Sequence, residues 1–177
     1  DINGDSRLDR VMRKVLAPYT NFVVQLNTGT GFTAGTNWGP VSAQGITSYD
    51  WNSVAAGGVN SYVDMLDMNG DGLPDRVMRK YLSPYTNLVV QLNTGIGFTS
   101  EVRWSPLTSQ GQADSLWNAL TLGDGVGNTA LALVDLNGDG LPDRIMRRYS
   151  SPYTNFVVQF NNGAGFEAEE IWGPLDG

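Results

Sequence analysis

Apolar and polar residues alternate with a two-residue period in short segments along most of the chain, as they do in β-strands. In the C-terminal third, four candidate strands follow one another: LALVD (131–135), RIMRRYS (144–150), NFVVQFN (155–161) and FEAEEIW (166–172). The turn residues of SPYTN separate the second from the third, and the glycines of NNGAG separate the third from the fourth. The pattern predicts a four-stranded antiparallel meander.

This pattern is repeated along the chain. Residues 1–32, 67–98 and 135–166 align without gaps, and the second segment is identical to each of the other two at 24 of 32 positions. The strands expected in the second repeat lie near 61–67, 76–82, 87–93 and 98–104. The first repeat lacks the opening strand, because the sequence begins at Asp1.

Meanders repeated at periods of 66 and 68 residues are typical of β-propeller blades. We therefore expect an all-β protein of about three blades: residues 1–39 form blade 1 without its first strand, 40–105 a connection and blade 2, and 106–177 a connection and blade 3. Known propellers close with about four to eight blades or more. The three blades are thus expected to belong to a larger propeller, or to self-assemble by pairing their open edges with other chains. Because the sequence starts inside a motif, we also expect a mature fragment or an excised piece.

Composition narrows the chemistry. The chain has no Cys and no His, which argues against zinc or copper sites and against Ser-His or Cys-His catalysis. A formal net charge of −7 argues against nucleic acid as the main partner. The longest apolar stretches are too short to span a bilayer, so no membrane insertion is expected.

Each repeat carries a cluster of aspartates, which repel one another unless a cation lies between them. In DMNGDGLPD, oxygen-bearing side chains fall at loop positions 1, 3, 5 and 9, namely Asp67, Asn69, Asp71 and Asp75. Glycines let the backbone curl, so the carbonyl of Leu73 can face the same point. Six or seven oxygen ligands, water included, suit Ca²⁺ better than Mg²⁺. The sequence predicts up to three bound Ca²⁺ ions, one per repeat.

The loop D-x-[DN]-x-D-G-x-x-D, lying between the first two strands of a blade, resembles the FG-GAP/VCBS repeat of integrin-α-like β-propellers. The added LPDR and VQLNTG segments resemble the VCBS repeats of bacterial Rhs and Tc-toxin-like secreted proteins. The resemblance covers essentially the whole chain and implies a secreted or cell-surface location. It maps the calcium ligands, counting the carbonyls of Arg7, Leu73 and Leu141, onto Asp1, Asn3, Asp5, Arg7 and Asp9, then Asp67, Asn69, Asp71, Leu73 and Asp75, then Asp135, Asn137, Asp139, Leu141 and Asp143.

The first calcium site is expected to be the weakest. Ser6 replaces the glycine found at positions 72 and 140, and Leu8 replaces the proline found at 74 and 142. A non-glycine residue held at positive φ costs on the order of 1 kcal/mol.

Two further features recur in the repeats. Cationic triplets on the second strand (Arg10/Arg13/Lys14, Arg76/Arg79/Lys80 and Arg144/Arg147/Arg148) are interpreted as pairing with loop aspartates or stacking between blades, rather than as an anion surface. The PYTN turns place Tyr19, Tyr85 and Tyr153 at equivalent positions on one rim. There, tyrosine suits either coverage of the next blade or contact with a sugar or protein ligand.

The main functional prediction is a calcium-loaded scaffold, adhesion or recognition module of a larger extracellular protein, and not an enzyme. The alternative is a glycan-binding lectin with equivalent sites at the PYTN rim or between blades. A polyspecific hydrolase fragment is less favoured, because paired catalytic carboxylates such as those of glycosidases need two differently tuned acids in one cleft rather than three equivalent clusters.

Overall fold

The structure is a computed structural model that describes residues 1–45, 49–57, 60–112, 115–123, 128–151 and 153–175. Within these residues the chain is all-β, with three antiparallel sheets. The first sheet consists of β1 (Arg10–Arg13), β2 (Phe22–Gln25) and β3 (Thr36–Trp38). The second consists of β4 (Val63–Leu66), β5 (Asp75–Arg79), β6 (Leu88–Gln91) and β7 (Val102–Trp104). The third consists of β8 (Leu122–Gly123), β9 (Thr129–Val134), β10 (Asp143–Arg147), β11 (Phe156–Gln159) and β12 (Glu170–Trp172).

The predicted meander is confirmed, since each sheet keeps its strands in sequence order. The first sheet has three strands and starts at the strand that corresponds to β5, as expected from the missing opening strand. The observed strands are shorter than predicted, because the ladder narrows to a single bridge at the turns, for example between Asn93 and Phe98. The two-residue strand β8 was not predicted. It pairs with β9 and adds a fifth strand to the third sheet.

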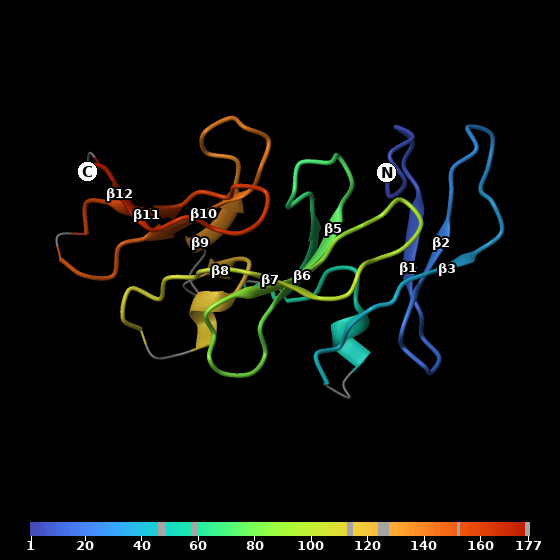
Figure 1. Cartoon of the computed structure of the whole chain (residues 1–177), viewed down its shortest axis with the longest axis horizontal. Coiled ribbons are helices and arrows are strands. Elements are labelled where there is room, and N and C mark those ends of the chain that lie inside the picture. Colours follow the sequence, from blue (N-terminus) through green and yellow to red (C-terminus); the bar gives the residue numbers. More distant parts are fainter. Residues whose placement is uncertain (46–48, 58–59, 113–114, 124–127, 152, 176–177) are drawn as a thin grey trace.

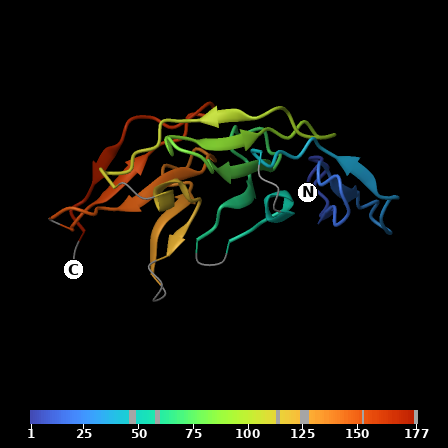
Figure 2. The ribbon, with the colours of Figure 1, turned by 90° about the horizontal axis from the view of Figure 1, so that it is seen from below.

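The three sheets follow one another in an open arc, with the two chain ends at opposite ends of the array (Figures 1 and 2). Hydrophobic clusters join neighbouring sheets. Trp38 of the first sheet and Phe98 of the second share one cluster, and Trp104 of the second and Phe166 of the third share another. In the described part of the chain, the sheets do not close into a ring. The closed or larger propeller therefore stays a prediction.

The connections between sheets hold short 3₁₀ turns, η1 (Tyr49–Asn52) and η2 (Ser115–Asn118). Asn52 donates from its side-chain amide to the carbonyl of Lys14, 3.0 Å away, and Asn118 donates equivalently to Lys80 at 2.5 Å. Trp51 is buried against Val63 of the second sheet. Trp51 thus packs against the first strand of the next sheet, while Asn52 ties the connection to the preceding one.

Two arginines of the cationic triplets, Arg76 and Arg144, are completely buried. Arg76 donates to the carbonyls of Ser42 (2.8 Å) and Trp51 and lies over the Phe22 ring, so it fills the junction between the first two sheets. Burial lowers the pKa of Arg76 to about 9, partly offset by the charge of Glu101. Stacking between blades is confirmed for Arg76, but its partners are carbonyl oxygens rather than loop aspartates.

Among the described residues, no helix is long and apolar enough to cross a membrane.

Candidate functional site

The three Asp loops lie along one edge of the array, before β1, between β4 and β5, and between β9 and β10 (Figure 1). The second and third loops share one hydrogen-bond pattern. Asp67 accepts from the backbone N–H groups of Gly70 and Gly72, each at 2.8 Å. Asp71 accepts from the Leu73 N–H at 2.8 Å and from the Asn69 amide at 3.0 Å. These bonds curl the backbone as predicted for a cation loop.

The aspartate at position 9 of the loop faces inward instead. Asp75 is fully buried and accepts from the N–H groups of Met68 (2.9 Å) and Asn93 (2.8 Å), so it ties the start of the loop to the end of the next hairpin. Asp143 repeats this arrangement with Leu136 and Asn161. Burial raises the pKa of Asp75 to about 6, against the two N–H bonds, which lower it. This position therefore has a structural role in addition to the predicted ligand role.

The first loop brings its carboxylates closest together. Oxygens of Asp1, Asp5 and Asp9 lie within 4.8 Å of one another, a separation at which one cation could contact all three. Ser6 adopts φ 67°, the left-handed conformation that Gly72 and Gly140 adopt in the other loops. The backbone strain expected at this non-glycine residue is therefore present. Asp5 also lies 4.0 Å from the guanidinium of Arg7. The donor set fits Ca²⁺ by type and convergence.

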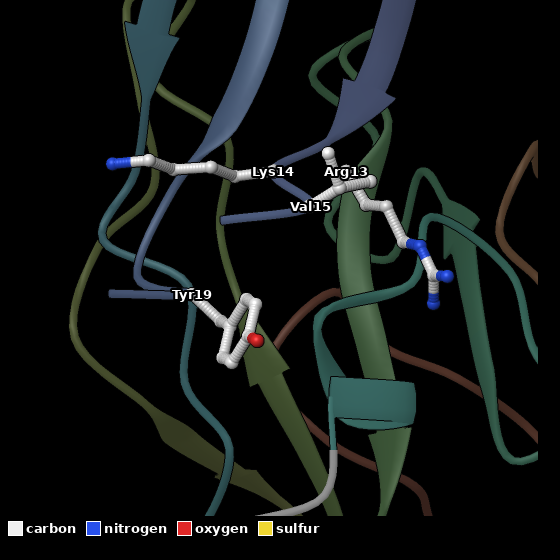
Figure 3. Close-up of a pocket in the computed structure, with 4 residues that line it drawn as sticks. All are labelled: Arg13, Lys14, Val15 and Tyr19. Atoms are coloured by element: carbon white, nitrogen blue, oxygen red, sulfur yellow. The ribbon is translucent and has the colours of Figure 1, made fainter. Parts of the chain in front are cut away.

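A second group of candidate residues lies at the PYTN turns. In the first two sheets these turns project from the edge opposite to the Asp loops (Figure 1). Arg13, Lys14, Val15 and Tyr19 line a hollow of about 240 Å³ at the end of β1. Figure 3 shows the Tyr19 ring beside the strand end, with Arg13 and Lys14 pointing to opposite sides, so the hollow has an aromatic wall between two cations.

The third sheet has the same hollow at the same positions. Arg147, Arg148, Tyr149 and Tyr153 line a space of about 390 Å³. Tyr153 is 72% exposed and Tyr149 is held edge-on against Trp117, with the Arg147 guanidinium 4.6 Å from the Tyr149 ring centre. We call these two hollows the rim pockets. They unite the arginine and tyrosine features that the sequence showed separately, whereas the contributions of Val15 and Tyr149 had no sequence signal of their own.

The second repeat differs at this position. Tyr81, which corresponds to Tyr149, packs against Trp51, and Arg79 lies over the Tyr62 ring. Tyr85 is half-buried, while Lys80 lines a separate hollow with polar residues of the neighbouring strands, including Asn87 and Glu101. The three PYTN tyrosines are therefore not equivalent in surroundings, although they are equivalent in sequence.

Comparison with known proteins gives one informative result. No family model matches the chain, and no curated protein sequence matches it significantly. Among solved structures, the fold is similar to a lectin of Agrocybe aegerita, described by its specific recognition of non-reducing terminal N-acetylglucosamine. The match has a TM-score of 0.54 and 22% identity, and it covers 98% of this chain and 37% of the lectin chain.

The assignment to the FG-GAP/VCBS repeat, and with it the likeness to Rhs and Tc-toxin proteins, is therefore wrong: no model of such a family matches, and the structural match is to a lectin. The physical reason is that the Asp loop is a short local motif. Apart from the bonds of its position-9 aspartate, its hydrogen bonds join residues two to five positions apart, so the loop does not determine how the surrounding sheets are arranged. The matched structure is a lectin and not an enzyme, and at 22% identity the match shows the shared fold alone.

Proposed function

We propose that the chain is a glycan-binding module, built of β-propeller blades, that holds terminal sugars in the rim pockets. The observation that carries the proposal is the repetition of one hollow, with tyrosine and two cationic side chains, at equivalent positions of the first and third sheets. The fold shared with a lectin supports it. Because that lectin recognises non-reducing terminal N-acetylglucosamine, this sugar is the first ligand to test.

The chemistry of the rim pockets suits a sugar. The flat face of a tyrosine ring offers apolar contact to the C–H face of a pyranose, and its hydroxyl group can exchange hydrogen bonds with sugar hydroxyls. Arginine and lysine supply only donors, which pair with sugar hydroxyl and carbonyl oxygens. Shallow, open hollows suit the end of a glycan chain. A secreted or cell-surface location, where such glycans occur, is part of the proposal.

Replacing both pocket tyrosines should weaken glycan binding strongly. In the double variant Tyr19→Ala/Tyr153→Ala, the apolar wall of each rim pocket is lost, and we expect the affinity for N-acetylglucosamine-terminated glycans to fall about tenfold or more. A glycan array followed by titration of the best ligand measures this. The double variant Tyr19→Phe/Tyr153→Phe keeps the rings and should bind within a few-fold of the unmodified chain.

Tyr85→Ala is the control in the second repeat, where the half-buried tyrosine lines neither rim pocket. It should leave binding unchanged. If Tyr85→Ala abolishes binding while the double alanine variant does not, the sugar site lies elsewhere on the blades.

We propose in addition that the Asp loops bind Ca²⁺ as a structural metal, with ligands as mapped above. The supporting observation is the convergence of Asp1, Asp5 and Asp9. An ion in each loop would offset the repulsion among its three aspartates. The three loops together hold nine aspartates, half of the acidic residues of the chain. The blades would then be rigid supports for the rim pockets.

Calcium should raise the melting temperature by about 5 °C or more relative to chelator, because an ion that binds only the folded state stabilises it. Differential scanning calorimetry in Ca²⁺, in Mg²⁺ and in chelator measures the shift, and Mg²⁺ should have a smaller effect. Ser6→Gly removes the strained φ and should strengthen the weakest site in a calcium titration. If there is no heat of binding and the melt is unchanged, the loops are closed by their own hydrogen bonds alone.

A further inference from the structure

The same sheet-to-sheet contact occurs twice inside the chain. At the first junction, the Phe98 N–H donates to the Gly39 carbonyl (3.0 Å) and the Asn93 amide donates to the Ile2 carbonyl (2.8 Å). At the second junction, Phe166 donates to Ser105 (3.1 Å) and Asn161 to Met68 (2.9 Å). These residues occupy identical repeat positions. A later sheet therefore offers a phenylalanine and an asparagine, and the preceding sheet offers carbonyl groups and a tryptophan.

The polar part of the contact is repeated as well. The Gln91 side chain accepts from the Ser42 N–H at 2.8 Å and donates to the Pro40 carbonyl at 3.0 Å. The Gln159 side chain does the same with Thr108 at 2.9 Å and Pro106 at 3.0 Å. Each junction thus combines several specific hydrogen bonds with an apolar contact.

Each half of this contact is left open at one end of the array. On the first sheet, Phe32 is 54% exposed, whereas its equivalents Phe98 and Phe166 are 5% and 3% exposed. On the third sheet, Trp172 is 39% exposed, whereas its equivalents Trp38 and Trp104 are 4% and 3% exposed. The end of the array that carries Phe32 therefore lacks the partner that the end carrying Trp172 could supply.

The glycine before each of these phenylalanines shows the same difference between the open face and the two junctions. A β-carbon on Gly97 or Gly165 would lie 2.6 Å from a carbonyl oxygen of the preceding sheet, that of Gly39 or Ser105, so both junctions need glycine there. The equivalent Gly31 has nothing within 4 Å of such a carbon. Glycine at position 31 has no steric role in the isolated chain, although it is the residue that the docked contact requires.

We infer that the Phe32 face of one chain docks onto the Trp172 face of a second copy of this chain, in the geometry of the two internal junctions. The contact is head-to-tail, so its repetition must close into a ring or continue as a filament. Two copies of the 177-residue chain bring together six sheets, within the four to eight blades typical of propellers, whereas three copies would bring together nine. The expected assembly is therefore a closed dimer with two identical contacts.

Docking would bury the two exposed aromatic residues and carry four rim pockets on one particle. Several weak sugar sites on a rigid particle bind a glycan-coated surface far more tightly than one site does. Assembly is nevertheless separate from sugar recognition, since the rim pockets use none of the residues of the docking faces.

Analytical ultracentrifugation of the 177-residue chain over a range of concentrations tests the inference. We expect a monomer–dimer equilibrium for the unmodified chain and a dissociation constant about tenfold or more higher for Gly31→Ala, which adds one methyl group where the isolated chain has open space. Circular dichroism should show the Gly31→Ala monomer to be folded as the unmodified monomer is. Ile96→Ala, at an 84% exposed position of the second repeat outside both faces, should leave the dimer unchanged.

A mixing experiment tests the head-to-tail geometry. Trp172→Ala damages the other face, so each single variant should be monomeric alone at concentrations where the unmodified chain dimerises. When the two variants are mixed, the Trp172→Ala chain supplies an intact Phe32 face and the Gly31→Ala chain supplies an intact Trp172 face. A dimer with one contact should therefore form. An unmodified chain that stays monomeric up to its solubility limit overturns the inference. A dimer that Gly31→Ala leaves intact, or variants that gain nothing on mixing, do so as well.

Discussion

Replacing Arg144 by alanine is expected to lower the free energy of unfolding by about 3 kcal/mol or more, because this guanidinium is completely buried. It donates to the Thr108 carbonyl (3.0 Å), to the Gln159 side chain (2.9 Å) and to the Trp117 carbonyl. Alanine would remove these bonds, deprive the Thr108 and Trp117 carbonyls of this donor, and open a cavity at the junction of the second and third sheets. Urea unfolding followed by tryptophan fluorescence and circular dichroism measures the loss.

Arg10 provides the matched control, since it occupies the same repeat position on the first sheet but is exposed. Its guanidinium donates to the Gln25 side chain at 2.8 Å. Arg10→Ala should change the stability of the monomer by less than about 1 kcal/mol. Equal losses in the two variants would show that burial between sheets is not what makes the arginine important.

Replacing Asp75 by asparagine should destabilise the chain by about 2 kcal/mol, measured in chelator so that metal binding plays no part. Both carboxylate oxygens accept from buried N–H groups, those of Met68 and Asn93. Asparagine has nearly the same shape but offers one oxygen and one NH₂ group, so one buried N–H would face a donor. The same unfolding experiment measures the change.

Glu170→Gln serves as its control, because this exposed side chain makes only a 3.4 Å contact with Trp172. It should alter the stability by less than about 0.5 kcal/mol. If Asp75→Asn is equally mild in chelator, position 9 of the loop has no structural role and acts only through an ion.

The strands were predictable because short apolar, β-branched segments lie between strong turn residues, as Leu88–Gln91 does between PYTN and the following glycines. Strand β8 was missed because two residues carry no measurable period. Stacking of Arg76 between sheets was one of the two roles predicted from its repeat position. Its hydrogen-bond partners were not predictable, since backbone carbonyl groups such as that of Ser42 have no signature in sequence.

The candidate sites show the same division. The curl of the Asp loops was predictable, because glycine and alternating oxygen side chains act locally. The family was not, because a nine-residue loop does not determine how sheets are arranged. The rim pockets depend on the position of each PYTN turn relative to the strand before it, which the sequence of the turn does not determine. Near-identical sequences therefore have open pockets at Tyr19 and Tyr153 but a half-buried ring at Tyr85.

Isothermal titration of the chain with an N-acetylglucosamine-terminated oligosaccharide tests glycan binding most directly. Recognition by the rim pockets predicts saturable binding with two sites per chain, one at the first sheet and one at the third. The affinity measured for the Tyr19→Ala/Tyr153→Ala chain should be about tenfold or more lower. No saturable binding to this glycan or to any glycan of a broad array, by a chain shown to be folded, would contradict the proposed function.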